Sequence, residues 1–196
     1  RDPADPYRLT DEERELVEKI HASFMNSEKL KKHMRCLFTY GGMYLVCNSN
    51  LLYHASVPLN EDGSFKHVRI GTKEYWGHKL LQKTDQLIRT AYFDEDGSAE
   101  KNFALDYMWY MWCGPDAPSF DKDKMATFER YFIADKALHK ENKGYYYTLR
   151  NRADICDNIL AEFGVEPGPH SHIINGHVPV KTIKGERPIK ADGKLL

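Results

Sequence analysis

The fold is decided by the stretch HIINGHVP, residues 172–179. Its apolar run is typical of a short buried strand, which leads directly into a glycine-histidine turn and a proline. An earlier stretch, LYHASVP at residues 52–58, has the same organisation, with an apolar run followed by a histidine and then a proline. The sequence therefore predicts two strands that each end in a histidine, His54 and His177.

A histidine at a strand end suits a divalent metal site, because a neutral ring nitrogen is a good ligand at neutral pH and a strand holds it firmly. A purely structural role, in which each imidazole caps its strand, explains the same two residues. The residues alone leave both interpretations open for His54 and His177.

The rest of the chain mixes helical and strand patterns, which predicts an α/β fold. The helix that begins after Thr10 carries a capping-box signature, with Glu13 three residues later. The helix at 98–113 is apolar nearly all round, so we expect it to be buried on most sides. The first of these helices belongs to the range 7–38, which has a break near 26–27, and the remaining predicted helices are 73–92, 124–134 and 152–163. The predicted strands are 43–48, 51–57, 65–70 and 172–175.

Composition indicates a globular protein of 196 residues, 41% hydrophobic and 29% charged. A net charge of -1 gives no long-range attraction to nucleic acid or to an anionic membrane surface. No apolar run approaches the roughly 20 residues of a membrane helix, and the polar first residues do not form a signal peptide, so we expect a cytoplasmic protein. The four cysteines lack metal-binding spacing, and we expect them to be reduced and buried.

Several segments resemble the class III fructose-1,6-bisphosphatases, a branch of the calcineurin-like metallophosphoesterases. The residues that carry the resemblance are HIINGHVPVK at 172–181, GERPIK at 185–190, YHASVPLNEDG at 53–63, WCG at 112–114 and KMATFER at 124–130. The resemblance thus extends along nearly the whole chain.

The resemblance implies part of a calcineurin-like sandwich, a mixed sheet with flanking helices, plus a helical insertion at about 72–135. Residues 1–196 would be the C-terminal part of one catalytic domain. The implied reaction is metal-dependent hydrolysis of the 1-phosphate of fructose 1,6-bisphosphate in gluconeogenesis, with two Mn²⁺ ions. By resemblance, His54 and His177 each ligate one of these ions.

The family's other metal ligands lie in Asp-x-His, Gly-Asp-x-x-Asp-Arg and Gly-Asn-His-Glu motifs, which this sequence lacks. We therefore expect the N-terminal half of the domain and its final strands to be absent, with the last residues, 194–196, beginning a further buried strand. Two histidines without a bridging carboxylate should bind metal weakly. We expect no turnover from these residues alone.

Two basic residues are candidates for substrate binding. Arg150 lies where related phosphatases place an arginine that clamps phosphate, and Lys181, four residues beyond His177, could reach a second phosphate of a sugar bisphosphate. An exposed loop arginine and an exposed strand lysine explain the same residues.

Two alternatives remain. The parent enzyme could be another calcineurin-like phosphatase, acting on proteins or dinucleotides. The chain could also be a noncatalytic oligomerisation module that makes contact through the aromatic helix near Trp109, and a homo-oligomer is compatible with either function. Deep burial of Trp109 and Trp112 would remove the support for the oligomerisation module.

Overall fold

The computed structural model describes residues 4–5 and 7–196, which form two compact units divided after Gly41. The first unit contains helices α1 (Asp11–Met25) and α2 (Glu28–Tyr40). The hydroxyl of Thr10 accepts a hydrogen bond from the Glu13 amide at 3.2 Å, and the Thr10 amide donates to the Glu13 carboxylate at 2.9 Å. The predicted capping box is therefore confirmed.

The second unit, Gly42–Leu196, combines short strands with helices and confirms the α/β class. Its strands are β1 (Tyr44–Cys47), β2 (Asn50–Tyr53), β3 (Val68–Ile70), β4 (Lys73–Tyr75) and β5 (His172–Asn175). Its α-helices are α3 (Gly77–Phe93), α4 (Ala99–Cys113), α5 (Thr127–Phe132), α6 (Tyr146–Leu149) and α7 (Ala153–Glu162). Three 3₁₀ turns lie at Lys136–His139, Thr182–Lys184 and Ala191–Gly193.

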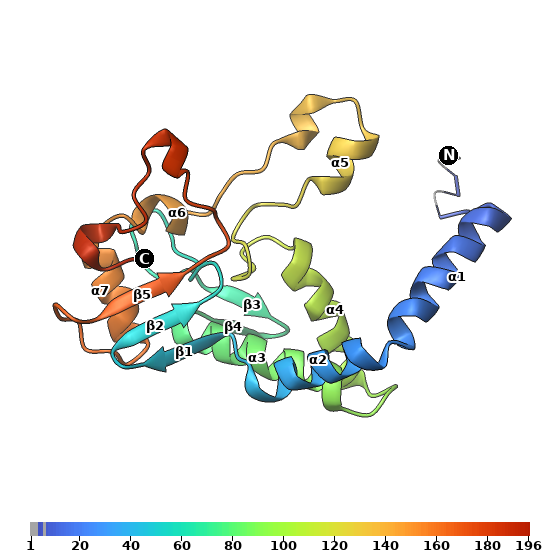
Figure 1. Ribbon diagram of the computed structural model, residues 1–196, viewed down its shortest axis with the longest axis horizontal. Coiled ribbons are helices and arrows are strands. Elements are labelled where there is room, and N and C mark those ends of the chain that lie inside the picture. Colours follow the sequence, from blue (N-terminus) through green and yellow to red (C-terminus); the bar gives the residue numbers. More distant parts are fainter. Residues whose placement is uncertain (1–3, 6) are drawn as a thin grey trace. The chain divides into compact units, whose positions relative to one another are not determined.

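The main sheet has the strand order β1-β2-β5 (Figure 1). β1 and β2 are antiparallel and are joined at Asn48 and Ser49, whose positive φ angles of 50° and 62° suit a tight hairpin turn. β2 and β5 are parallel, with Tyr53 opposite Asn175. Both strands therefore end at the same edge of the sheet, which brings their following residues together.

One face of this sheet is well covered. Leu51 and Ile173 are fully buried on it, and α7 packs behind β5 with Ile159 and Leu160 also buried (Figure 1). On the opposite face Ile174 remains 39% exposed. The alternation of buried and exposed positions is typical of a half-covered strand. The finer calcineurin-like sandwich stays a prediction.

The last residues of the chain add to the same sheet. The Ile173 amide donates to the Lys194 carbonyl at 2.7 Å, and the Leu196 amide donates to the Ile173 carbonyl at 2.9 Å, in a parallel bridge. Leu195 is buried. These residues pair beside β5 as a strand would, as the apolar pattern at 194–196 predicts.

Two helix predictions need correction. The helix predicted from residue 73 begins at Gly77, because residues 73–75 instead form β4 against β3. Helix α4 is not buried on most sides: Trp109 is 63% exposed and Trp112 is 43% exposed. An apolar composition all round the helix did not distinguish a buried helix from one with an uncovered face.

The range predicted as a helical insertion, 72–135, contains β4, α3, α4 and α5. Leu80 and Leu81 of α3 are fully buried in the core of the second unit. The assignment of this range as an insertion, and of the chain as one part of a catalytic domain, stays a prediction.

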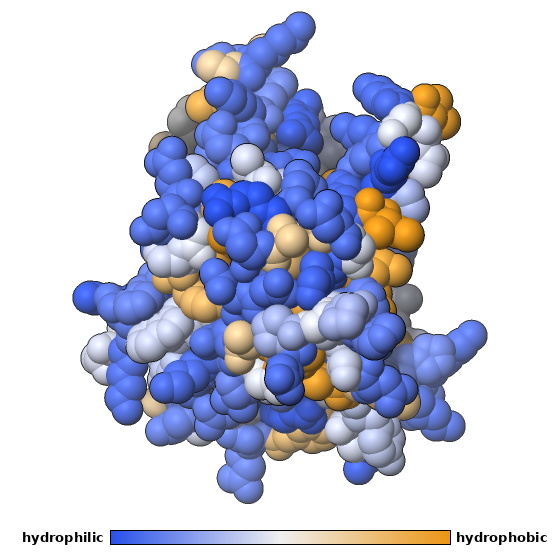
Figure 2. All heavy atoms as spheres, turned by 90° about the vertical axis from the view of Figure 1, so that its left-hand side faces the viewer, coloured by the Kyte–Doolittle hydropathy of each residue, from blue (hydrophilic) through white to orange (hydrophobic). Residues whose placement is uncertain are grey.

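Polar side chains dominate the face that Figure 2 presents, which is the left-hand side of Figure 1. No helix in the described part of the chain is both long and apolar enough to span a membrane.

All four cysteines are free, but only Cys156 is buried, so the expected burial is wrong for Cys36 and Cys47, which are exposed. Both lie on elements whose outer faces are open to solvent.

Candidate functional site

The two strand-end histidines meet at the edge of the sheet. The Nε2 atom of His54 lies 3.1 Å from the Nδ1 atom of His177, and the ring centroids are 5.0 Å apart with an interplanar angle of 77°. Both side chains are exposed. Two nitrogens at this separation share one proton in a hydrogen bond, and the same nitrogens are available to a metal ion once that proton leaves.

The backbone at His177 has an unusual conformation. Its φ angle is 62°, and the amide of Val178 donates to the carbonyl of Gly176 at 2.7 Å across it, which closes a three-residue turn. A positive φ costs free energy for a residue with a side chain, and such residues concentrate at functional sites. The turn is held in place because the Gly176 amide donates to the His54 carbonyl at 3.0 Å.

A buried hydrogen-bonded chain lies beneath the histidine pair. The hydroxyls of Tyr53 and Tyr146 are 2.8 Å apart, and the side-chain amide of Asn175 donates to the Tyr146 hydroxyl at 2.6 Å and to the Ala55 carbonyl at 2.9 Å. Tyr146 is fully buried. These hydrogen bonds therefore connect the end of β2, the end of β5 and helix α6.

Burial also fixes the protonation of these tyrosines. It raises the pKa of Tyr53 and of Tyr146 far above the ordinary value, because a phenolate in this apolar surrounding would be poorly solvated. Both hydroxyls therefore remain protonated and keep their hydrogen bonds at neutral pH. A satisfied buried network of this kind rigidifies the residues that flank it, here His54 and His177.

Two cations from residues just before and just after α6 lie beside this network. The guanidinium of Arg150 lies 5.2 Å from the ring centroid of Tyr147, and the ammonium of Lys143 lies 5.2 Å from the same ring. Arg150 is only 8% exposed. Two cationic side chains thus lie near the ring of Tyr147, and cation–π attraction stabilises this arrangement.

The electrostatics connect these cations to the histidines. Burial lowers the pKa of His177, and the nearby His54, Lys122 and Lys143 lower it further. The pKa of Lys143 is lowered by burial and then by Arg150, Lys181 and Lys122. Positive charges thus lie close to one another and favour the neutral form of His177, the form that ligates metals.

The second predicted substrate-binding residue, Lys181, follows the histidine turn. Its side chain is exposed, and its backbone amide donates to the Glu186 carboxylate at 2.9 Å. Lys181 lies close enough to Lys143 to lower the pKa of the Lys143 ammonium, as Arg150 also does. The structure therefore brings Lys181 and Arg150 to the same basic region, and their role in substrate binding stays a prediction.

The donor set is compatible with part of a metal site. Two imidazole nitrogens converge, but the described residues contain no group of three or more His, Cys, Asp and Glu side chains placed to hold an ion. Among the described residues, His54 and His177 could supply two ligands, and a complete ion site would need further ones.

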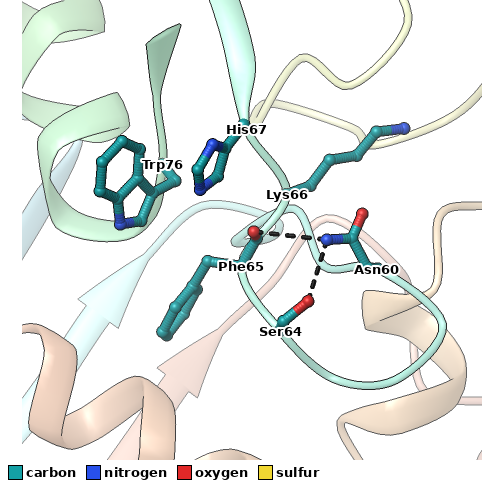
Figure 3. A pocket seen from close by; sticks show the side chains of 6 residues that line it. All are labelled: Asn60, Ser64, Phe65, Lys66, His67 and Trp76. Atoms are coloured by element: carbon teal, nitrogen blue, oxygen red, sulfur yellow. Dashed lines mark hydrogen bonds between the residues drawn. The ribbon is translucent and has the colours of Figure 1, made fainter.

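A separate pocket of about 510 Å³ lies beside the loop before β3, and none of the predicted site residues lines it (Figure 3). The rings of His67 and Trp76 stack in it at 4.2 Å, and the Asn60 side-chain amide donates to the Ser64 hydroxyl at 3.0 Å. The lining residues are Asn60, Ser64, Phe65, Lys66, His67 and Trp76. Because the stacked partner covers one face of Trp76, the pocket offers little free aromatic surface.

Sequence reasoning missed Tyr146, Tyr147 and Lys143. The available signal was the run of three tyrosines at 145–147, shortly before Arg150. Nothing in their spacing indicated that one hydroxyl would lie beneath the histidines while the next ring would hold two cations.

Comparison with known proteins identifies the family. The family described as "Firmicute fructose-1,6-bisphosphatase" matches residues 1–196, and the chain therefore belongs to this family. The predicted relationship to fructose-1,6-bisphosphatases is confirmed.

Curated relatives carry the name fructose-1,6-bisphosphatase class 3. The chain is 84% identical to the protein of Bacteroides fragilis and 83% identical to that of Bacteroides thetaiotaomicron, over 195 residues in each case. It is 56% identical to the protein of Clostridium novyi. Each match covers 100% of this chain, but the chain spans only 29% of the length of these relatives. No solved structure matches the chain.

Proposed function

We propose that this chain forms part of an enzyme that hydrolyses the 1-phosphate of fructose 1,6-bisphosphate. The observation that carries the proposal is the convergence of His54 Nε2 and His177 Nδ1 at 3.1 Å, beside a group of basic side chains, in a member of this family. A pair of imidazoles beside cations suits the combined recognition of a metal ion and a phosphate ester.

In this proposal His54 and His177 are manganese ligands, and the remaining ligands lie in the longer protein. A bound metal ion would polarise the phosphate ester and supply a nucleophilic hydroxide. The chain's own residues have two further tasks. The network of Tyr146 and Asn175 orients the imidazoles, and Arg150 and Lys181 bind the phosphate oxygens of a sugar bisphosphate.

The proposal also includes the fold and the location of the enzyme, which are a calcineurin-like fold and the cytoplasm. Activity on another phosphate ester, such as a phosphoprotein or a dinucleotide, is the alternative within the same chemistry.

Oligomerisation through α4 is a second candidate function, and one observation favours it. Trp109 and Trp112 are exposed rather than buried, and their ring centroids are 5.0 Å apart. An aromatic surface of this kind suits a protein contact. Oligomerisation through α4 is compatible with the enzymatic proposal, because none of the predicted site residues lies on α4.

The test uses the Bacteroides fragilis relative, with its matching segment replaced by this chain. We expect the exchanged protein to release phosphate from fructose 1,6-bisphosphate in the presence of Mn²⁺. His54→Ala and His177→Ala should each lower kcat about 100-fold or more, because each removes a ligand that the chemistry requires. Phosphate release would be measured with unchanged circular dichroism as the folding control.

His170→Ala is the matched control, since His170 is an exposed histidine a few residues before the same turn. It should leave kcat within about twofold of the parent value. An exchanged protein without activity, where the unexchanged relative is active, would overturn the proposed function. Equal activities for the His54, His177 and His170 variants would overturn the assignment of the two histidines.

A further inference from the structure

We propose that Lys143 and Arg150, placed on the ring of Tyr147, form a subsite for the phosphate group that the reaction retains. The inference rests on the proposed function, because it takes the ligand to be a sugar bisphosphate. It adds two residues that sequence reasoning missed, Lys143 and Tyr147, and it separates the site of the retained phosphate from that of the cleaved phosphate.

The strongest observation is an unpaired N–H group on a buried cation. Arg150 is 8% exposed, and its Nε atom is buried without a hydrogen-bond partner among the described residues. Leaving a guanidinium N–H buried and unpaired is costly, so such a group calls for a ligand that accepts its hydrogen bond. A phosphate oxygen is the acceptor that guanidinium groups bind best.

Lys143 completes the pair. Its ammonium and the Arg150 guanidinium both lie 5.2 Å from the Tyr147 ring centroid, so one aromatic ring positions both charges. The Tyr147 hydroxyl is itself fixed, because it donates to the Phe120 carbonyl at 2.9 Å. In the proposed subsite this fixed ring holds Lys143 and Arg150 near each other, so that one phosphate would contact both.

Two acids lie near the pair, and neither is paired with it. Glu186 is already hydrogen-bonded to the Lys190 ammonium and to the backbone amide of Lys181. Asp121, which acts on Tyr147, is buried, and burial raises its pKa to about 7, so its carboxyl is only partly charged at neutral pH. The pKa of Lys143 is lowered, first by burial and then by Arg150. The pair therefore retains an excess of positive charge that an anion would relieve.

The connection to the histidines identifies the anion. Tyr147 directly follows Tyr146, whose hydroxyl accepts a hydrogen bond at 2.6 Å from the side-chain amide of Asn175, two residues before His177. The cation pair on Tyr147 therefore adjoins the network that supports the histidine pair. A ligand with phosphates at its two ends would place one phosphate at the histidines and the other at Lys143 and Arg150.

Steady-state kinetics of the exchanged protein test the assignment. Fructose 1-phosphate lacks the retained phosphate, so it should be insensitive to the subsite. We expect Lys143→Gln to raise KM for fructose 1,6-bisphosphate about tenfold and KM for fructose 1-phosphate less than twofold, with Lys143→Arg restoring the parent values. Lys140→Gln is the matched control, because Lys140 is an exposed lysine three residues away. Equal changes for both substrates, or no change for either, would overturn the inference.

A binding measurement separates this inference from the proposed function. Inorganic phosphate is titrated into the 196-residue chain and followed by NMR signals of the Arg150 and Tyr147 side chains. We expect saturable shifts. The Kd for phosphate that they give should rise at least fivefold in Lys143→Gln and stay unchanged in Lys140→Gln. This result would support the anion subsite even if the exchanged protein were inactive. An absence of shifts, or equal shifts in both variants, would overturn it.

Discussion

Two regions of the second unit contrast in how completely this chain builds them. At the strand ends of β2 and β5, the histidine pair rests on Tyr53, Tyr146 and Asn175, whose polar groups are satisfied beneath the surface. On α4 and α5, large aromatic side chains lie open to solvent, and Phe132 is 81% exposed. The first region is covered by the core, whereas α4 buries Ala104, Tyr107 and Met111 on one side and leaves its other side open.

The site region is stabilised by contacts within this chain, whereas one face of α4 and α5 is not covered by the other described residues. Burial of apolar area and satisfied hydrogen bonds hold the site region together, so its geometry depends on residues far apart in sequence but present here. The aromatic side chains of α4 and α5 contact one another, with the Trp112 and Phe128 rings 6.1 Å apart, yet a broad apolar face remains uncovered. Substitutions in the two regions should therefore have very different effects.

The largest expected effect is at the covered face of the sheet. Ile173→Ala should lower the free energy of unfolding by about 2–5 kcal/mol, because it leaves a cavity at a fully buried position. Ile174→Ala, on the exposed face of the same strand, is the matched control and should cost less than about 1 kcal/mol. Urea denaturation of the chain measures both. Equal losses would mean that both faces of β5 are covered.

The next effect depends on pH and involves Asp121, which is 2% exposed. Burial raises its pKa to about 7, so the native state favours the protonated carboxyl. The stability that this proton contributes is fully present below about pH 4 and is lost as pH rises through about 7. The difference in the free energy of unfolding between Asp121→Asn and the parent should therefore depend on pH. Between pH 4 and pH 8 it should shift in favour of the variant by about 2–4 kcal/mol. Parallel denaturation curves at both pH values would contradict the burial of this carboxyl.

A smaller effect is expected for the polar chain under the histidines. Tyr146→Phe removes the hydroxyl that Tyr53 and Asn175 share, leaving buried polar groups unsatisfied, and should cost about 1–3 kcal/mol. In the exchanged protein it should also lower kcat, because the histidine loops lose a common anchor. Tyr145→Phe, at an exposed neighbouring tyrosine, is the control. A kcat loss of equal size in that control would show that the network does not position the histidines.

The smallest effect belongs to the aromatic helix. Trp109→Ala should change the free energy of unfolding by less than about 0.5 kcal/mol, since the side chain is 63% exposed. Sedimentation of the same variant shows whether α4 carries a contact, because weaker self-association than in the parent would accompany loss of an interface residue. A large loss of stability in monomeric protein would instead show that Trp109 is buried in solution.

The sequence predicts the positions of the two histidines well, because a short apolar run before each one predicts the strand that ends there. It does not predict that β2 and β5 are parallel neighbours, since their pairing joins residues more than 100 positions apart. The exposure of Trp109 was missed for a related reason. Composition shows that a helix can be buried, but not whether another element covers it.

The basic region shows the same limit. The sequence predicts Arg150 and Lys181 from their positions beside segments that resemble the family, whereas Lys143 lies in a loop whose residues follow no periodic pattern. In the folded protein both side chains lie on the ring of Tyr147, which relates Lys143 to Arg150. Residues that work together through an aromatic ring leave little trace in spacing.

The most direct measurement titrates Mn²⁺ into the chain and follows the histidine signals by NMR, where a bound paramagnetic ion broadens the resonances of its ligands. We expect the signals of His54 and His177 to broaden together at Mn²⁺ concentrations that leave those of His139 and His172 sharp. Broadening of only one of the pair, or uniform broadening of all four histidines, would contradict a shared metal role for the two strand ends.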